Sequence, residues 1–158
     1  MSYKKRRKSG NRLIKSKKTS IDGVEFKSRL EGNMYKLLKE SGLSFEYEKE
    51  KFTIVTGFKF VNDSYERNAN GKGEVVQKGG GKSVKKIEYT PDFVITINET
   101  KYIIETKGFR TSEFNMRYKL FKRYIKDNDL DYHLYMPHTK TECVKVLQII
   151  KSKINERQ

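Results

Sequence analysis

The longest apolar stretch of this chain covers residues 93–104 and is divided by a short polar segment. Residues 93–97 and 102–104 consist mainly of Val, Ile, Tyr and Phe, which favour buried strands. The polar residues 98–100 between them predict a tight turn. The pattern therefore predicts an antiparallel hairpin whose two open ends lie side by side.

Apolar residues recur at spacings of three and four in three other segments, which predicts three amphipathic helices. The first covers residues 26–39. The second runs from an N-cap at Ser112 to about residue 126, and the third starts at Thr139 or Thr141. Each of these helices should bury one face against a sheet or a partner.

Two further segments have the character of strands. Residues 43–55 begin with strict alternation and predict a half-buried strand, continued or followed by a second one, and residues 132–136 predict another. Residues 62–86, in contrast, are rich in Gly, Asn and Lys, and a loop of this length is usually functional or disordered. We expect a flexible insertion there, with Val75 and Val76 in one strand of a hairpin.

The chain has 158 residues, of which 35% are hydrophobic, which suits a single domain at residues 20–158. Its net charge of +15 attracts polyanions such as nucleic acids. The first 18 residues hold nine Lys or Arg and no acidic residue, so residues 1–19 predict a flexible basic arm. The arm would grip DNA, or it would serve only as a solubilising or localisation segment. Candidate DNA contacts lie in this arm and around the second helix: Lys4, Lys5, Arg6, Arg7, Lys17, Lys18, Arg110 and Arg117.

Composition and motif content argue against several other classes of protein. No run approaches the ~20 apolar residues of a membrane span. The basic amino terminus lacks the apolar region of a secretory signal, and no lipidation motif accompanies the charge. The single cysteine, Cys143, cannot form an intrachain disulfide, which fits a reducing compartment such as the cytoplasm. Cys143, His133 and His138 lack the spacing of zinc ligands.

Three charged residues mark the open end of the predicted hairpin. Asp92 precedes its first strand, and Glu105 and Lys107 follow its second. Antiparallel pairing brings Asp92 next to Glu105, and adjacent carboxylates repel unless a cation lies between them. Mg²⁺ suits this position because it prefers carboxylate, carbonyl and water oxygens. Lys107 would then orient an attacking water or neutralise charge on a phosphate; the simpler alternative is a surface hairpin with solvated ends.

An ordered set of residues in and after the hairpin is similar to the signature of the PD-(D/E)XK nucleases: Pro91, Asp92, Glu105, Thr106 and Lys107. The chain further resembles the phage endonuclease I family of Holliday-junction resolvases in the segments FKSRLEGNMYKLL, GLSFEYEKEKF, YTPDF and ETKG. The resemblance covers about residues 23–109. It implies an α/β fold with a restriction-endonuclease-like core, in which helices flank a central mixed β-sheet.

The same resemblance implies an active site and partners. The active site would contain four side chains: Glu31, Asp92, Glu105 and Lys107. Mg²⁺, for which Mn²⁺ would substitute, would be held by Asp92, Glu105 and the main-chain carbonyl of Thr106. The resemblance also implies branched DNA as the substrate, an intertwined homodimer, and the cytoplasm of a bacterial or phage-infected cell. Residues 62–86 exceed what such enzymes need, which leaves the dimer geometry open.

These observations predict a Mg²⁺-dependent DNA endonuclease that attacks a phosphodiester in line with an activated water. One alternative is a homing, mismatch-repair or restriction-type endonuclease that reads a duplex sequence on the same core. The other is a DNA-binding protein without catalysis. The close pair of carboxylates argues against the second alternative, since a protein that only binds an anion gains nothing from them.

Overall fold

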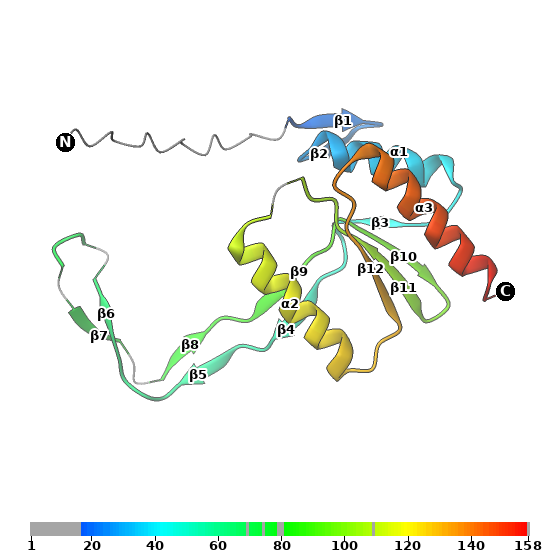
Figure 1. The fold of residues 1–158 in the computed structure, drawn as a ribbon. Coiled ribbons are helices and arrows are strands. Elements are labelled where there is room, and N and C mark those ends of the chain that lie inside the picture. Colours follow the sequence, from blue (N-terminus) through cyan, green and yellow to red (C-terminus); the bar gives the residue numbers. More distant parts are fainter. Residues whose placement is uncertain (1–16, 69, 74, 79–80, 109, 158) are drawn as a thin grey trace, which may run out of the picture.

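The computed structural model describes residues 17–68, 70–73, 75–78, 81–108 and 110–157, and its fold is α/β (Figure 1). The central four-stranded sheet has the order β12–β11–β10–β3. Its strands are β3 (Glu46–Tyr47), β10 (Phe93–Ile97), β11 (Thr100–Ile104) and β12 (Tyr132–Tyr135). The sheet is mixed, because β11 pairs with β12 in parallel and the other two pairings are antiparallel.

The predicted hairpin is confirmed as β10 and β11. Its turn contains Asn98, whose φ of 53° lies in the left-handed region that asparagine tolerates better than most residues. The pairing register places Phe93 opposite Ile104. Asp92 and Glu105, the next residues outward, therefore lie at the same end of the hairpin.

Three helices cover the sheet: α1 (Arg29–Glu40), α2 (Ser112–Asp127) and α3 (Lys140–Asn155). In Figure 1, α1 and α3 lie together on one side of the sheet and α2 lies on the other. Within the described residues, no helix is both long enough and apolar enough to cross a membrane.

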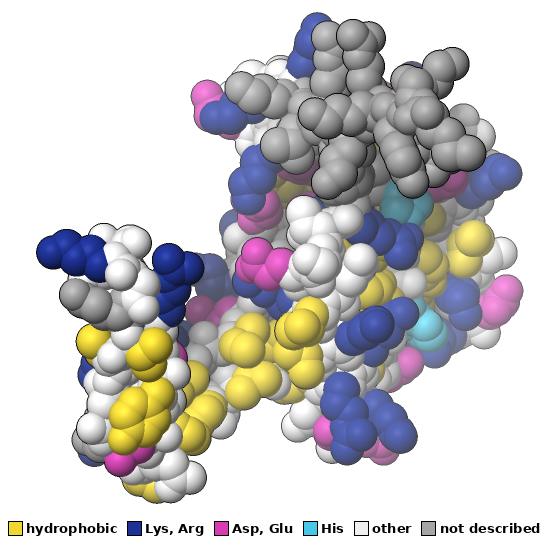
Figure 2. All heavy atoms as spheres, turned by 60° about the vertical axis from the view of Figure 1, so that its left-hand side comes forward, with side chains coloured by type: hydrophobic (Ala, Val, Ile, Leu, Met, Phe, Trp, Pro, Cys, Tyr) yellow, Lys and Arg dark blue, Asp and Glu magenta, His cyan; other side chains and the backbone are white. Residues whose placement is uncertain are grey.

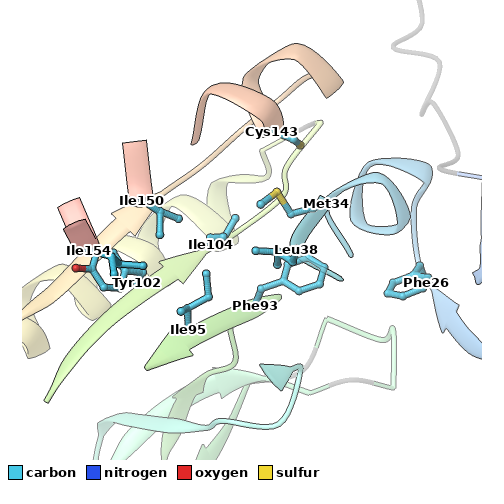
Figure 3. Close-up of a cluster of buried hydrophobic side chains, with 10 residues drawn as sticks. All are labelled: Phe26, Met34, Leu38, Phe93, Ile95, Tyr102, Ile104, Cys143, Ile150 and Ile154. Carbon is cyan, nitrogen blue, oxygen red and sulfur yellow. The ribbon is translucent and has the colours of Figure 1, made fainter. Parts of the chain in front are cut away.

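The hairpin is buried on both faces because alternate side chains enter two different cores. One core joins the hairpin to α1 and α3 and contains Phe26, Met34, Leu38, Phe93, Ile95, Tyr102, Ile104, Cys143, Ile150 and Ile154 (Figure 3). The other core joins the opposite face to α2 and to strands β4 (Phe52–Val55) and β9 (Ile87–Tyr89). It contains Phe52, Tyr89, Val94, Ile103 and Phe121.

The helix starts differ from the predicted ones in two places. Phe26 was predicted to open the first helix, but it ends β2 (Val24–Phe26), which pairs with β1 (Thr19–Ile21). The helix begins after Ser28, whose hydroxyl accepts from the backbone N–H of Glu31. The N-cap of α2 is Thr111 and not Ser112, because the Thr111 hydroxyl accepts from the N–H of Phe114. For α3, Thr139 is the N-cap of the two candidates.

A ribbon of paired strands extends from the body of the protein (Figure 1). Beyond β4 and β9, strand β5 (Phe58–Phe60) pairs with β8 (Lys82–Val84), and β6 (Ser64–Arg67) pairs with β7 (Val75–Lys78). We call residues 57–86 the β-arm. The predicted insertion at 62–86 thus contains paired strands, with Val75 and Val76 in β7, while its flexibility stays a prediction.

Candidate functional site

Asp92 lies at the start of β10 and is 9% exposed. Its Oδ2 atom accepts hydrogen bonds from the backbone N–H of Thr106 at 2.7 Å and from the Thr106 hydroxyl at 2.6 Å. Its Oδ1 atom accepts no hydrogen bond from any described residue. One oxygen of this carboxylate is therefore fixed by the protein, and the other is left to bind something else.

Glu105 follows β11 and is 5% exposed. Its backbone N–H donates to the carbonyl of Tyr135 at 2.9 Å, which extends the sheet pairing by one residue. Its Oε2 accepts from the hydroxyl of Tyr89 at 3.0 Å, and Lys107 Nζ lies 3.4 Å from Oε1. The contact with Lys107 is long for a hydrogen bond, so the ammonium group is close but not tightly held.

Glu31 is a third buried carboxylate, although its position beside the apolar stripe of the helix predicts an exposed charge; it is 6% exposed. Its Oε2 accepts from the N–H of Lys27 at 3.0 Å and from the hydroxyl of Tyr47 at 2.9 Å. Its Oε1 accepts from the Ser28 hydroxyl at 2.8 Å. The Ser28 hydroxyl thus caps the first turn of α1 by accepting from the N–H of Glu31, and the Glu31 carboxylate in turn holds the Ser28 hydroxyl and the N–H of Lys27 just before the helix.

The three carboxylates act on one another electrostatically. Burial, then the charge of Glu105 and that of Glu31, raises the pKa of Asp92 to about 7, against the opposing hydrogen bonds from Thr106. Burial also raises the pKa of Glu105, while Lys107 and the hydroxyl of Tyr89 lower it. Burial and the neighbouring carboxylates thus disfavour the charged form of Asp92, and a cation bound beside it would favour that form.

Two positive groups near this site are Lys107 and Arg110. The Lys107 ammonium is 4.5 Å from the ring centroid of Phe114 on α2. The carbonyl of Lys107 accepts from Nδ1 of His138, and the Arg110 guanidinium donates to Nε2 of His138 at 2.7 Å. Because a carbonyl only accepts and a guanidinium only donates, His138 has its proton on Nδ1. Arg110 is thereby anchored to the segment that carries Lys107.

Tyrosines complete the shell around the carboxylates. Burial, together with the adjacent carboxylates, raises the pKa of both Tyr89 and Tyr47 well above the usual range for phenols. Both therefore stay protonated at neutral pH and donate permanently, Tyr89 to Glu105 and Tyr47 to Glu31. Each donor fixes the orientation of one carboxylate.

The donor set fits a hard cation better than a transition metal. Among the described residues, no three His, Cys, Asp or Glu side chains form a group that could hold a metal by themselves. Mg²⁺ is typically coordinated by one or two carboxylates, a backbone carbonyl and several waters, because it keeps much of its hydration shell. The residues that could hold such a cation are Asp92, through its Oδ1 atom, and Glu105.

Comparison with known protein families adds one result. Residues 12–142 match the family described as "Protein of unknown function (DUF1064)". The chain belongs to the DUF1064 family. No curated protein and no solved structure matches it.

In this DUF1064 chain, the structure gathers the four predicted active-site side chains, Glu31, Asp92, Glu105 and Lys107, at one end of the sheet. Thr106 lies among them, and it contacts Asp92 through its backbone N–H and its hydroxyl, both of which donate to the carboxylate.

The predicted DNA-binding residues of the DUF1064 chain are spread more widely. Arg110 is close to the site through His138. Burial, then the charge of Glu105, raises the pKa of Tyr118, and the charge of Arg110 opposes this rise. Arg117 lies on α2 and pairs with Glu113 at 2.7 Å. Lys17 and Lys18 are exposed ahead of β1. Lys4, Lys5, Arg6 and Arg7 lie outside the described residues.

Proposed function

We propose that this chain is a Mg²⁺-dependent endonuclease that hydrolyses phosphodiester bonds in DNA. The observation that carries the proposal is the buried pair of Asp92 and Glu105 with the Lys107 ammonium 3.4 Å from Glu105. Burying two adjacent carboxylates is costly, and nothing in the packing of the hydrophobic cores requires it. A net charge of +15 supports a polyanionic substrate.

Asp92 and Glu105 would bind the ion, and hydrogen bonds from neighbouring residues fix the orientation of both carboxylates. When bound, Mg²⁺ supplies a Lewis acid that polarises the phosphate and lowers the pKa of an attacking water. Asp92 would present Oδ1 to the ion, because Thr106 occupies Oδ2 with two donors. Glu105 would bind beside it, oriented by Tyr89. The Thr106 carbonyl as a third ligand is part of the proposal by resemblance.

The remaining charged residues would act on the nucleophile and the phosphate. Lys107 is one-third exposed, so its ammonium reaches solvent as well as Glu105 and can orient a water or neutralise the phosphate. Arg110 would contact a neighbouring phosphate. Glu31, locked by three hydrogen bonds, would contribute negative charge at the back of the site, towards a second ion or an ordered water.

The finer assignment rests on the resemblance to phage endonuclease I. Three features support a restriction-endonuclease-like core: a mixed sheet with helices on both faces, an acidic pair at the open end of a hairpin, and a helix glutamate nearby. We extend the proposal to branched DNA as the preferred substrate and to a homodimer as the active form. Sedimentation velocity of the full chain measures the second of these directly.

The test of the proposed function is a cleavage assay on a panel of synthetic DNAs. A four-way junction, a flap, a mismatched duplex and its linear duplex would be incubated with Mg²⁺, with Mn²⁺ or with EDTA. We expect cuts in the junction with either metal, sparing of the linear arms, and no product in EDTA. Cleavage of linear duplex at a fixed sequence would replace the junction assignment by a sequence-specific endonuclease. Binding without any cleavage would leave only the DNA-binding alternative.

The Tyr89→Phe variant is expected to bind Mg²⁺ about 10- to 100-fold more weakly, because a residue that orients a metal ligand contributes on this scale. The change removes only the hydroxyl that Glu105 accepts from. Titration calorimetry with Mg²⁺ measures the effect.

The matched control is Tyr135→Phe. The buried hydroxyl of Tyr135 has no hydrogen-bond partner within the described part of the chain, so its removal should leave Mg²⁺ affinity unchanged and should not destabilise the fold. Equal Mg²⁺ affinities of Tyr89→Phe and Tyr135→Phe would show that Tyr89 does not position a ligand.

A further inference from the structure

The β-arm exposes several large hydrophobic side chains. Phe58 is 52% exposed and Val84 is 41% exposed, and the two lie directly opposite each other on β5 and β8. Figure 2 shows hydrophobic side chains along the arm with basic side chains beside them. An exposed apolar patch bordered by charge usually marks a binding surface.

A groove of about 460 Å³ runs along this part of the arm. Its lining combines aromatic, aliphatic and basic residues: Gly57, Phe58, Lys59, Ser83, Val84, Lys85 and Lys86. Among these residues there is no carboxylate. Gly57 is required for the shape, because a Cβ there would lie 3.0 Å from the carbonyl oxygen of Val84 and 3.2 Å from the N–H nitrogen of Lys86.

We propose that this groove binds a single strand of nucleic acid that leads away from the active site, with an unpaired base stacked on Phe58 and phosphates contacted by Lys59 and Lys85. Aromatic platforms next to lysines are the means by which proteins bind single strands without reading their sequence. Lys86 is already paired with Glu88 at 2.8 Å, so the other two lysines carry the phosphate contacts.

The position of the groove agrees with such a strand. Lys86 precedes Tyr89 by three residues, and the Tyr89 hydroxyl donates to Glu105. At about 3.3 Å per residue, Lys86 lies roughly 10 Å along the ribbon from Tyr89, the residue whose hydroxyl reaches the site.

Charge argues for nucleic acid over a second copy of this chain as the occupant. Three lysines line the groove, and one of them, Lys86, is paired with Glu88. A second copy docked groove to groove would bring the same lysines and no carboxylate, and like charges facing each other oppose such docking. A polyanion is attracted by the same lysines and covers the aromatic ring with the face of a base.

Fluorescence anisotropy of a labelled 20-nucleotide oligothymidine, titrated with the full chain in EDTA, tests the groove. The Phe58→Ala variant should bind about 5- to 150-fold more weakly than wild type, with an unchanged dependence on salt. The double variant Lys59→Ala, Lys85→Ala should lower the slope of log K against log salt by about 1.4. Val75→Ala changes a 65% exposed side chain on β7 outside the groove and should bind as wild type does.

The inference would be overturned if wild type did not bind the oligonucleotide, or if the affinity of Phe58→Ala stayed within twofold of wild type. It would also be overturned if Phe58→Ala had a lower sedimentation mass but an unchanged DNA affinity, a result that would assign the groove to a second copy. The inference rests on the proposed function for the identity of its ligand, but its test is independent of hydrolysis. Binding as expected without Mg²⁺-dependent cleavage would refute the nuclease alone, whereas cleavage with unaffected groove variants would refute the groove alone.

Discussion

The Asp92→Asn variant is expected to lose Mg²⁺-dependent cleavage and, at pH 8 without metal, to be more stable than wild type. Loss of activity should reach at least about 10³-fold, since a neutral amide is a poor ligand for a hard cation. The gain in stability follows from removing a buried charge. Function and stability therefore make opposite demands on this residue.

The sign of the pH effect follows from the raised pKa of Asp92. Burial and Glu105 raise that pKa to about 7 in the folded protein, above its unfolded value near 4. A group of this kind stabilises the fold fully below the unfolded pKa and loses its contribution as pH rises through the folded one. For metal-free wild type, the loss between pH 4 and pH 8 is on the order of 4 kcal/mol.

Asparagine should recover about half of this loss, or about 2 kcal/mol, since its carbonyl oxygen can still accept from Thr106 while its NH₂ faces Glu105. Thermal unfolding in EDTA would then show a melting temperature roughly 4–8 °C above wild type at pH 8. At pH 5 the difference should nearly vanish, because Asp92 is protonated. Adding Mg²⁺ should stabilise wild type and leave the variant unchanged.

The matched control is Asp131→Asn, whose charge has the opposite role. Arg157 and the Thr100 hydroxyl lower the pKa of Asp131 to about 2, so its charged form is favoured in the fold. This variant should be destabilised at both pH 5 and pH 8 and should cut DNA normally. An Asp92→Asn protein that cuts at the wild-type rate, or one that is no more stable than wild type at pH 8, would contradict the assignment of Asp92.

The hairpin and the meeting of its charged ends could be predicted from the sequence because both follow from local pairing. Alternation across residues 93–104 determines which side chains enter each core, and a tight turn determines the register. Once Phe93 faces Ile104, Asp92 must come close to Glu105. The α/β fold follows from helices long enough to cover both faces.

The start of α1 could not be predicted in the same way. Phe26 continues the helical spacing of three and four, but it also pairs with Thr19 in a two-stranded ribbon. Its ring packs 4.9 Å from that of Tyr47, on a strand of the central sheet. Tertiary packing of one aromatic ring therefore outweighs a weak local preference, and the cap at Ser28 decides where the helix begins.

The tyrosine hydroxyls that contact the carboxylates were not predicted, because a tyrosine in a sequence can serve either as an apolar core residue or as a hydrogen-bond donor. Tyr89 and Tyr47 look like ordinary apolar strand residues, and their rings do lie in the cores. Only the fold shows that each hydroxyl reaches a carboxylate. One signal was present: Tyr89 lies three residues before Asp92, at the point where strand β9 approaches the hairpin.

The β-arm was obscured by its composition. Gly, Asn and Lys predict a loop, and the pairing of residues 58–60 with 82–84 spans more than twenty residues. Strand pairs this distant leave no periodic signal in a local window. The exposed rings of Phe58 and Phe60 were equally uninformative, because a sequence shows an aromatic residue but not its exposure.

Replacing Lys107 with methionine is expected to lower the rate of cleavage by about 10²- to 10³-fold without weakening Mg²⁺ binding. Methionine keeps an unbranched apolar stem against the ring of Phe114, so packing should be preserved. In the wild-type protein, the Lys107 ammonium lies 3.4 Å from Glu105 and competes with any cation for this carboxylate. Its removal should leave Mg²⁺ affinity equal to that of wild type or higher, because one positive charge no longer repels the ion.

Single-turnover cleavage and titration calorimetry with Mg²⁺ separate the two effects. Lys122→Met is the matched control, since the Lys122 ammonium also lies over a ring, 4.9 Å from the centroid of Tyr118, but no described contact links it to Glu105. That variant should cut and bind Mg²⁺ as wild type does. A Lys107→Met protein that cleaves within about threefold of wild type would remove Lys107 from the chemistry. In an intact site, loss of a competing charge can only strengthen cation binding. A Lys107→Met protein that binds Mg²⁺ tenfold more weakly would therefore show that Lys107 supports the geometry of the site and does not act on the phosphate.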